Sequence, residues 1–242
     1  MTQERDRQAI DEIVRGLAQL PVPLTLANPN HVRCLQVAYG WCAEIHRLAR
    51  AVVLLLDQEL GHEARPLVRV LLEHTVTLHW LVEAGDGAAE AVLAKHERSM
   101  QKLRKDAEGG PLLPSSLLAL AKSGEIPILR EDQALRDFRS ICKDLSLLNT
   151  LYAVFRLESA YVHPSWAGAA AFMAGDSDHP ALRPTPSIPT DGLVQLVAAC
   201  LVWASHDLDS LLAGHPWRQR LEQIAAELGV LPHLPALPLS TP

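Results

Sequence analysis

The longest helical pattern in the sequence runs from His31 to Leu60, and it constrains the fold more than any other segment. Asn30 precedes it as a residue type that favours a helix N-cap, and Gly61 follows it where glycine commonly ends a helix. At about 1.5 Å per residue, roughly 30 helical residues extend about 45 Å. A helix of this length predicts a long spine against which the other segments of the chain pack.

Other helical patterns precede and follow this spine. They cover residues 3–20, 63–84, 86–107, 115–122, 130–145, 191–212 and 217–228, with a short helix capped by Ser165 and ending at Met173. Leucine and alanine outweigh valine and isoleucine, and aromatic residues make up only 5%, which favours helix over strand. The sequence therefore predicts an all-α fold: a single-domain helical bundle of seven or more helices over residues 1–231. Residues 175–190 should be an irregular loop, and the proline-rich tail, 232–242, should be disordered or extended.

Charge and cysteine usage bound the function. The net charge of −6 argues against general affinity for DNA or an anionic membrane surface, although it leaves room for a local basic site. The four cysteines form no Cys-x-x-Cys pair, which indicates buried free thiols in a reducing compartment. The N-terminus lacks the apolar core of a signal peptide, and no apolar run approaches the roughly 20 residues of a membrane span. We expect a cytoplasmic protein without a membrane partner.

The most specific pattern is a polar stripe within residues 148–166. The stripe consists of Asn149, Tyr152, Arg156, Ser159 and His163. Its members recur at alternating steps of three and four, which places them on one face of a helix. The rest of this helix is mostly apolar, as is typical of a buried helix, and Pro164 should end it near His163. The stripe is expected to face a cleft, a partner or internal hydrogen-bond partners.

The stripe carries residue types that suit phosphate chemistry. An arginine such as Arg156 can neutralise a phosphate, and a histidine such as His163 can transfer a proton near neutral pH. The electronegative end of the helix favours the protonated imidazole. Arg156 and His163 are therefore the candidate catalytic residues. The candidate binding residues are Asn149, Tyr152, Ser159 and Ser165. The alternative interpretation is a polar seam that neighbouring helices satisfy and that holds the bundle in register.

Glu158 lies on the opposite, most apolar side of the same helix, and a lone buried carboxylate needs a partner. Arg65, Arg69 and Glu73 follow one another at one-turn spacing within residues 64–73. Arg69 and Glu73 can pair on an exposed helix surface, whereas a buried Arg69 could pair with Glu158 or hold the stripe helix. A structural role is the favoured interpretation for Arg69, Glu73 and Glu158.

Two further patterns have plain interpretations. The basic segment contains Lys95, Arg98, Lys102, Arg104 and Lys105. It could contact a phosphate backbone, but a solvated helix face is the favoured interpretation. The eleven histidines form neither an HExxH motif nor paired ExxH elements, so we expect no metal site and no cofactor. A Gly-rich phosphate loop, a GxSxG elbow and a CxxC pair are also absent, which removes the common nucleotide, hydrolase and redox classes.

Two segments, residues 64–73 and 156–165, together resemble a bacterial all-helical family of unknown function. In that family an Arg-x-x-x-Glu helix accompanies a later Ser-x-x-x-His-Pro-Ser motif. The matching polar residues here are Arg69, Glu73, Ser159, His163 and Ser165. The resemblance extends over residues 35–210, and it implies no established activity.

Arg156, followed after six residues by His163, is more distantly similar to the Arg-x4–6-His pattern of HEPN-type helical ribonucleases of toxin and antiviral systems. That resemblance implies metal-independent RNA cleavage, in which the arginine stabilises the phosphoryl transition state and the histidine assists attack by the 2′-hydroxyl. It also implies a homodimer, because such sites usually lie at a dimer interface. The alternative is a non-catalytic interaction or regulatory module whose polar seam is structural or ligand-binding.

Overall fold

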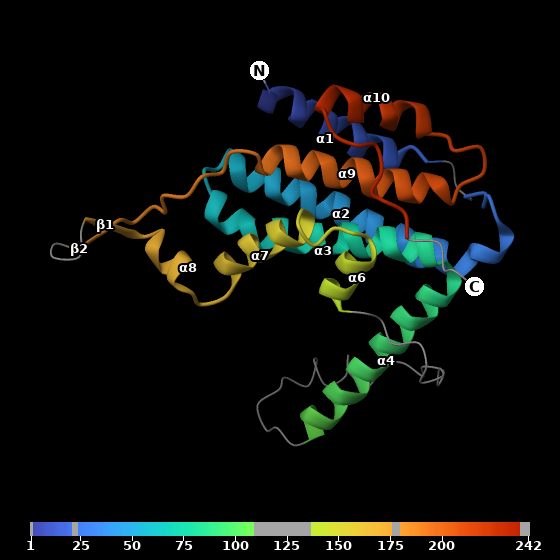
Figure 1. The fold of residues 1–242 in the computed structure, drawn as a ribbon, viewed down its shortest axis with the longest axis horizontal. Coiled ribbons are helices and arrows are strands. Elements are labelled where there is room, and N and C mark those ends of the chain that lie inside the picture. Colours follow the sequence, from blue (N-terminus) through green and yellow to red (C-terminus); the bar gives the residue numbers. More distant parts are fainter. Residues whose placement is uncertain (1, 21–23, 109–136, 176–179, 238–242) are drawn as a thin grey trace.

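The structure is a computed structural model that describes residues 2–20, 24–108, 137–175 and 180–237 (Figure 1). The α-helices are α1 (Thr2–Ala18), α2 (Val32–Asp57), α3 (Gly61–Ala84), α4 (Asp86–Glu108), α6 (Phe138–Asp144), α7 (Leu151–Val162), α8 (Trp166–Ala170), α9 (Leu193–Ser210) and α10 (Arg218–Leu228). The described residues also contain one 3-10 turn, η1 (Pro29–His31), and two short strands, β1 (Met173–Gly175) and β2 (Pro180–Leu182). The predicted all-α, single-domain bundle of seven or more helices is confirmed. The predicted helix at 115–122 and the start of the one predicted at 130–145 lie outside the described residues.

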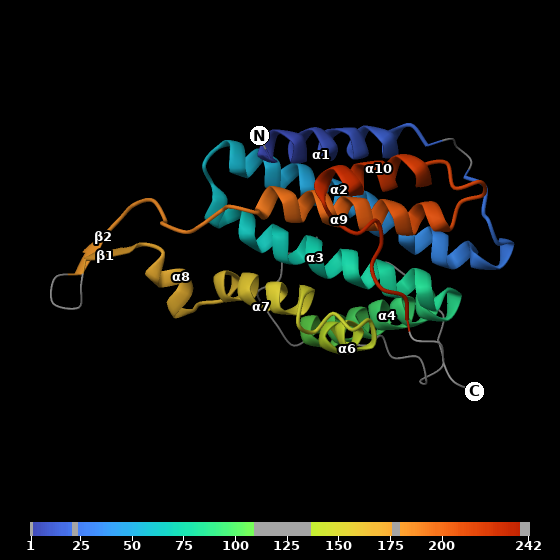
Figure 2. The ribbon, with the colours of Figure 1, turned by 45° about the horizontal axis from the view of Figure 1, so that its top comes forward.

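The helices form layers around α9, whose residues are nearly all buried. Helices α2 and α3 pack on one side of α9, and α1 and α10 cover the other side (Figure 2). Helix α7 packs on the outer side of α3, next to α6, at the edge of the bundle (Figure 2). The apolar core is continuous from α1 to α10 because each of these layers contributes buried Leu, Ile, Val and Ala side chains to it.

The predicted spine exists as α2, but its end differs from the prediction. The helix spans 26 residues and ends at Asp57, and the chain reverses through Glu59, which has a positive φ of 59°. Gly61 does not end this helix. It begins α3 instead, where a Cβ atom would overlap the side chain of Thr190. Close packing against a distant loop, which the local sequence does not reveal, therefore explains this glycine.

Helix α8 and the strands β1 and β2, which follow Pro164, form a small arm that projects from the bundle (Figures 1 and 2). The predicted cap is confirmed, since the Ser165 side chain accepts a hydrogen bond from the backbone N–H of Gly168 at 3.1 Å. The segment predicted as an irregular loop contains β2, which pairs antiparallel with β1 in the register Met173 with Leu182. The short helix predicted to end at Met173 ends at Ala170 instead, and the paired strands β1 and β2 replace its predicted end and part of the expected loop.

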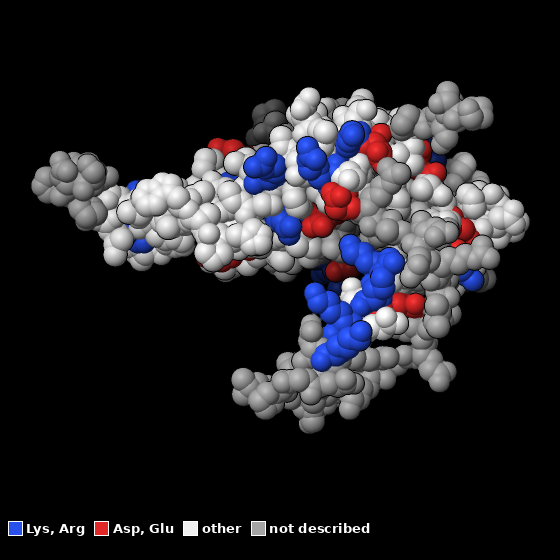
Figure 3. All heavy atoms as spheres, turned by 60° about the horizontal axis from the view of Figure 1, so that its bottom comes forward, with Lys and Arg blue, Asp and Glu red and all other residues white. Residues whose placement is uncertain are grey.

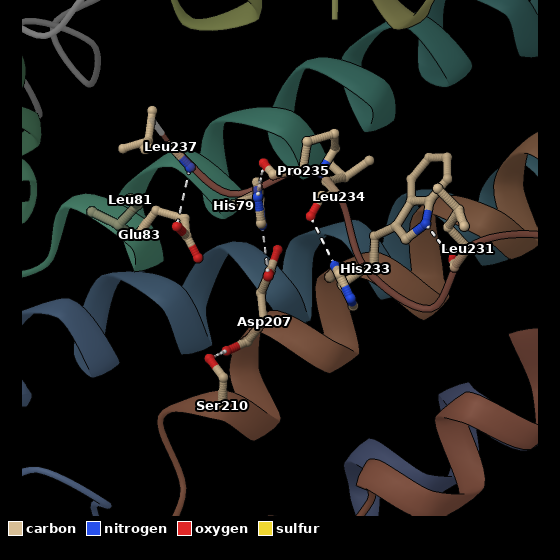
Figure 4. A network of polar contacts seen from close by, with 12 residues as sticks. His79, Leu81, Glu83, Asp207, Ser210, Leu231, His233, Leu234, Pro235 and Leu237 are labelled. Atoms are coloured by element: carbon tan, nitrogen blue, oxygen red, sulfur yellow. Dashed lines mark hydrogen bonds and ion pairs between the residues drawn. The ribbon is translucent and has the colours of Figure 1, made fainter. Parts of the chain in front are cut away.

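The chain after α10 runs along α3 and α9 (Figure 4). The indole N–H of Trp203 donates to the carbonyl of Leu231 at 2.8 Å, and the backbone N–H of Leu237 donates to Glu83 Oε2 at 3.2 Å. Leu234 is buried between these two attachments. The described part of the tail, up to Leu237, is therefore extended and fastened to the bundle, whereas residues 238–242 lie outside the described residues.

His79 of α3 makes the central contact beneath this tail. Its Nε2 donates to the carbonyl of Pro235 at 2.9 Å, and its Nδ1 lies 2.8 Å from Asp207 Oδ1 (Figure 4). Burial by itself lowers the pKa of His79, but the hydrogen bonds to Asp207 and Pro235 and the charge of Asp207 outweigh burial, and the net pKa is raised. Both ring nitrogens face acceptors, an arrangement that favours the imidazolium, while burial raises the pKa of Asp207 and the contact with His79 opposes that rise.

His46 of α2 is buried in the opposite state. Its Nδ1 donates to the carbonyl of Cys42 at 2.7 Å, which leaves Nε2 as the acceptor for the Ser205 hydroxyl at 3.3 Å. Burial lowers the pKa of His46 to about 4, so the ring is neutral near pH 7. All four cysteines are also buried and unpaired. None of the described helices combines the length and the apolar character that crossing a membrane requires.

Candidate functional site

Helix α7 is not the buried helix that its apolar content predicts. Glu158 is its only buried residue, and Leu157 is 58% exposed. The reason is that this short helix packs on α3 and α6 along one side, so its outer side remains at the surface. Asn149 is exposed and precedes the start of the helix at Leu151, so it is not part of a helical stripe. The predicted cleft containing all five stripe residues is therefore not formed by one face of α7.

Two stripe residues face the bundle. Ser159 Oγ accepts a hydrogen bond from Arg69 Nε at 2.9 Å and donates to the carbonyl of Phe155 at 2.7 Å. Tyr152 stacks on Phe155, with ring centroids 6.0 Å apart, and lies against Phe138 of α6 at 6.2 Å. Ser159 and Tyr152 thus belong to contacts between helices, as the seam interpretation describes.

Arg156 and His163 lie on the outer side, and both are exposed. As Pro164 predicts, α7 ends at Val162, and His163 follows in an extended conformation with its backbone N–H bonded to Ser159 O at 3.4 Å. Seven residues at about 1.5 Å per residue separate the two side chains by roughly 10 Å along the helix. Both side chains are thus open to an external ligand. At this separation they can contact the same atom of a ligand only if the long Arg156 side chain extends toward His163.

Glu158 has a buried partner, and it is Arg65. The Arg65 Nη1 donates to both Glu158 oxygens, at 2.8 and 3.0 Å, while only 5% of Arg65 and 3% of Glu158 are exposed. The second guanidinium nitrogen donates to the carbonyl of Pro189, and the group lies 4.3 Å from the centre of the Tyr161 ring. Burial raises the pKa of Glu158, and the charge of Arg65 opposes this effect. This pair fixes the inner side of α7 to α3.

Arg69, one turn beyond Arg65, holds α7 in a different way. Its guanidinium lies 4.5 Å from the centre of the Phe155 ring, and its Nη2 lies 3.6 Å from Glu73 Oε2. Arg69 thus makes the predicted pair with Glu73 and, through Ser159 and Phe155, also holds the stripe helix. The partner of Glu158, by contrast, is Arg65. Ser165, besides capping α8, donates to the carbonyl of Ala160 and so fixes the junction of α7 and α8.

A pocket of about 200 Å³ opens beside Glu73. It is lined by Trp41, Glu73, His74, Thr77, Lys95, Phe138 and Ile141, which come from α2, α3, α4 and α6. His74 Nδ1 donates to Val70 O at 2.8 Å, and its Nε2 lies 3.6 Å from Glu44 Oε2. Sequence reasoning singled out Glu73 and Lys95 but did not place them together, because no local pattern links four separate helices. Within the described part of the chain, no group of three or more His, Cys, Asp or Glu side chains is arranged to hold a metal ion.

Residues 35–180 match DUF5677, a family of unknown function. The match covers more than half of the chain. The chain belongs to the DUF5677 family. No curated protein and no solved structure matches it. Both fixed contacts of α7, those of Arg65 and Arg69, lie within the DUF5677 region, as do Arg156 and His163. The expected membership of a family of unknown function is thereby confirmed, and the HEPN-like activity stays a prediction.

Proposed function

We propose that this DUF5677 protein is a HEPN-like, metal-independent ribonuclease of a toxin or defence type that works in the cytoplasm as a homodimer. Its chemical groups are Arg156 and His163. The observation that supports this proposal is that both side chains are exposed on the outer side of α7 while its inner side is anchored by Arg65 and Arg69. A rigidly held helix that presents a cation and an imidazole to solvent suits the binding of an external phosphate.

The chemistry follows from these two groups. His163 takes the proton of a 2′-hydroxyl, and the 2′-oxygen attacks the adjacent phosphorus. The bond from phosphorus to the 5′-oxygen breaks, and the leaving oxygen takes a proton from water. The hydroxide that remains takes the proton from His163, which restores the neutral imidazole, and the products carry a 2′,3′-cyclic phosphate and a 5′-hydroxyl. Arg156 stabilises the negative charge that builds up on the phosphoryl oxygens.

The homodimer is part of the proposal because the outer side of α7 is also apolar. Leu157 is 58% exposed, and Trp166, just after the helix, is 75% exposed. Pairing the α7 edges of two copies would cover these side chains. It would also bring Arg156 of one copy toward His163 of the other copy. The two groups could then act on one phosphate although they lie roughly 10 Å apart along a single helix.

The test is cleavage of single-stranded RNA by the full chain in the presence of a chelator. We expect His163→Ala and Arg156→Ala each to lower the rate about 100-fold or more, whereas Arg50→Ala, exposed on α2, should leave it unchanged. Substrates with a 2′-deoxy sugar at the cleaved position should resist. Equal rates in wild type and His163→Ala, or no cleavage by the wild type, would reject the catalytic assignment.

The second candidate function is a non-catalytic interaction module with a structural polar seam. The contact that favours it is the bond from Arg69 to Ser159, because it commits one stripe residue to internal packing. Under this alternative, the wild type does not cleave RNA. Ser159→Ala then lowers only the free energy of unfolding, because it removes the bond to Arg69.

A further inference from the structure

We infer that the pocket beside Glu73 and the basic side of α4 together form a binding groove for single-stranded RNA. One base occupies the pocket, and the backbone phosphates follow α4. This inference rests on the proposed function for the choice of RNA as ligand, and it assigns binding to residues separate from Arg156 and His163.

The first observation is a stripe of cations on α4, which we call the α4 basic stripe. It consists of Lys95, Arg98, Lys102 and Lys105. Steps of three, four and three residues place these side chains on one side of the helix, and all four are exposed. Figure 3 shows a continuous run of Lys and Arg side chains where α4 projects from the bundle. The stripe extends roughly 15 Å along the axis, enough to contact several consecutive phosphates.

Within the described part of the chain, these cations have no acidic partner. None of the four makes an ion pair with another residue of the described chain, in contrast to Arg33, whose Nη1 lies 2.7 Å from Glu90 Oε1 near the start of α4. Two more exposed cations, Arg139 and Lys143, lie on α6 near the pocket. Although the net charge of the chain is −6, six exposed cations therefore lie on α4 and α6, and they form a local basic site that this overall charge permits.

The second observation is that the pocket begins where the stripe begins, since Lys95 belongs to both. Trp41 and Phe138 supply aromatic rings to its walls, and its volume of about 200 Å³ suits a single planar base. Glu73 supplies a carboxylate that Arg69 holds only loosely, at 3.6 Å. Such a carboxylate accepts hydrogen bonds from the exocyclic amine of adenine or cytosine, which uracil lacks.

Aromatic walls in line with a row of cations favour a nucleic acid over an acidic peptide. The carboxylates of an acidic peptide would use the cations, but they would not fill the partly aromatic pocket lined by Trp41 and Phe138. A single strand is required because a base paired within a duplex is not free to enter a pocket. The ligand class is therefore single-stranded RNA with adenine or cytosine at the pocket.

The binding test uses the full chain with His163→Ala, so that a labelled oligonucleotide stays intact, and measures the Kd by fluorescence anisotropy against salt. Four phosphate contacts predict a slope of log Kd against log salt of about 3. Replacing Lys102 and Lys105 by Gln should halve this slope. The matched control replaces Arg47 and Arg50, exposed on α2, by Gln and should leave the slope unchanged.

The pocket is tested separately with Phe138→Leu and Glu73→Gln. We expect Phe138→Leu to raise the Kd for oligo(A) about tenfold through lost stacking. We expect Glu73→Gln to reduce the preference for oligo(A) over oligo(U) while keeping the salt slope. Urea unfolding of each variant shows whether a change in Kd reflects the pocket or the fold.

The outcomes separate this inference from the proposed ribonuclease. Binding that depends on Lys102 and Lys105, without any cleavage by the wild type, supports the groove and rejects the enzyme. Cleavage that depends on His163 and is unaffected by the α4 and pocket variants supports the enzyme and overturns the groove. An acidic peptide that binds as tightly as oligo(A) would also overturn it, because the pocket would then make no contribution.

Discussion

Glu158→Gln is the sharpest perturbation of the bundle, because it removes a charge from a buried pair and keeps its shape. Arg65 would remain with its positive charge 5% exposed and without an anionic partner. Breaking a buried ion pair from one side costs about 3–5 kcal/mol. The Pro189 carbonyl and the Tyr161 ring still face the guanidinium, so we expect the lower end of this range, about 3 kcal/mol.

The assay is equilibrium urea unfolding followed by circular dichroism. A loss of about 3 kcal/mol lowers the midpoint by roughly 1–2 M urea if the m-value is unchanged. The matched control is Glu90→Gln, which breaks the exposed pair with Arg33. That pair is open to solvent on both sides, so its loss should cost less than about 1 kcal/mol.

A double variant separates the cost of an unpaired charge from the value of the pair itself. Arg65→Met combined with Glu158→Leu removes both charges and keeps most of the volume. Such a replacement is often neutral or stabilising, so its free energy of unfolding should lie within about 1 kcal/mol of the wild type or above it. A Glu158→Gln variant that loses less than about 1 kcal/mol would refute the reasoning, as would a double variant as unstable as the single one.

Three further predictions concern groups whose state the structure defines. The folded-state pKa of His79 is raised above 6.5, so its contribution to stability is complete below pH 6.5 and is lost as the pH rises through the folded-state pKa. In calorimetry, the Tm of His79→Gln should therefore decline less steeply above pH 6.5 than the Tm of the wild type. The pKa of His46 is lowered to about 4, so the unfolded chain binds a proton at this residue before the folded chain does, and the free energy of unfolding falls as the pH drops from 6.5 to 4. His46→Gln should avoid roughly 3 kcal/mol of this loss in urea unfolding. If the variant shows the same dependence of unfolding free energy on pH as the wild type, the assignment is contradicted. Ser165→Ala removes both the N-cap of α8 and the bond to the Ala160 carbonyl, and it should cost about 1–2 kcal/mol. Ser165→Asp keeps an oxygen that can cap α8 but cannot donate to Ala160, so it should recover only part of this loss, which the unfolding midpoints of the two variants will check.

Local patterns were sufficient to predict the described α-helices and several of their ends. Pro164 predicts the end of α7, and Ser165 predicts the start of α8, because each acts through its own backbone or its nearest neighbours. The end of α2 was predicted less well. Gly61 has the residue type of a helix end, but its role is set by Thr190, about 130 residues away in the sequence. Only the packed structure supplies such a reason.

The candidate site was harder to predict, because its contacts depend on how two helices are aligned. Arg65 and Arg69 lie one turn apart on the same side of α3, so the sequence offers both as partners for Glu158. The alignment of α3 with α7 decides between them, since Arg65 meets Glu158 and Arg69 meets Ser159. The apolar content of α7 likewise predicted burial, yet neighbours pack along only one side of this helix.

The geometry of α7 links the two parts of the site. Successive helical residues turn by about 100°, so the side chains of Arg156 and Glu158, two residues apart in α7, point in almost opposite directions. The buried pair with Arg65 therefore fixes the direction in which the outer side of this 12-residue helix faces. Arg69 adds a second attachment at the border between the two sides, through Ser159, and so resists rotation of the helix about its axis. The buried pair of Arg65 and Glu158 and the partly buried contact of Arg69 with Ser159 thus determine how the outer side of α7 is presented to a ligand.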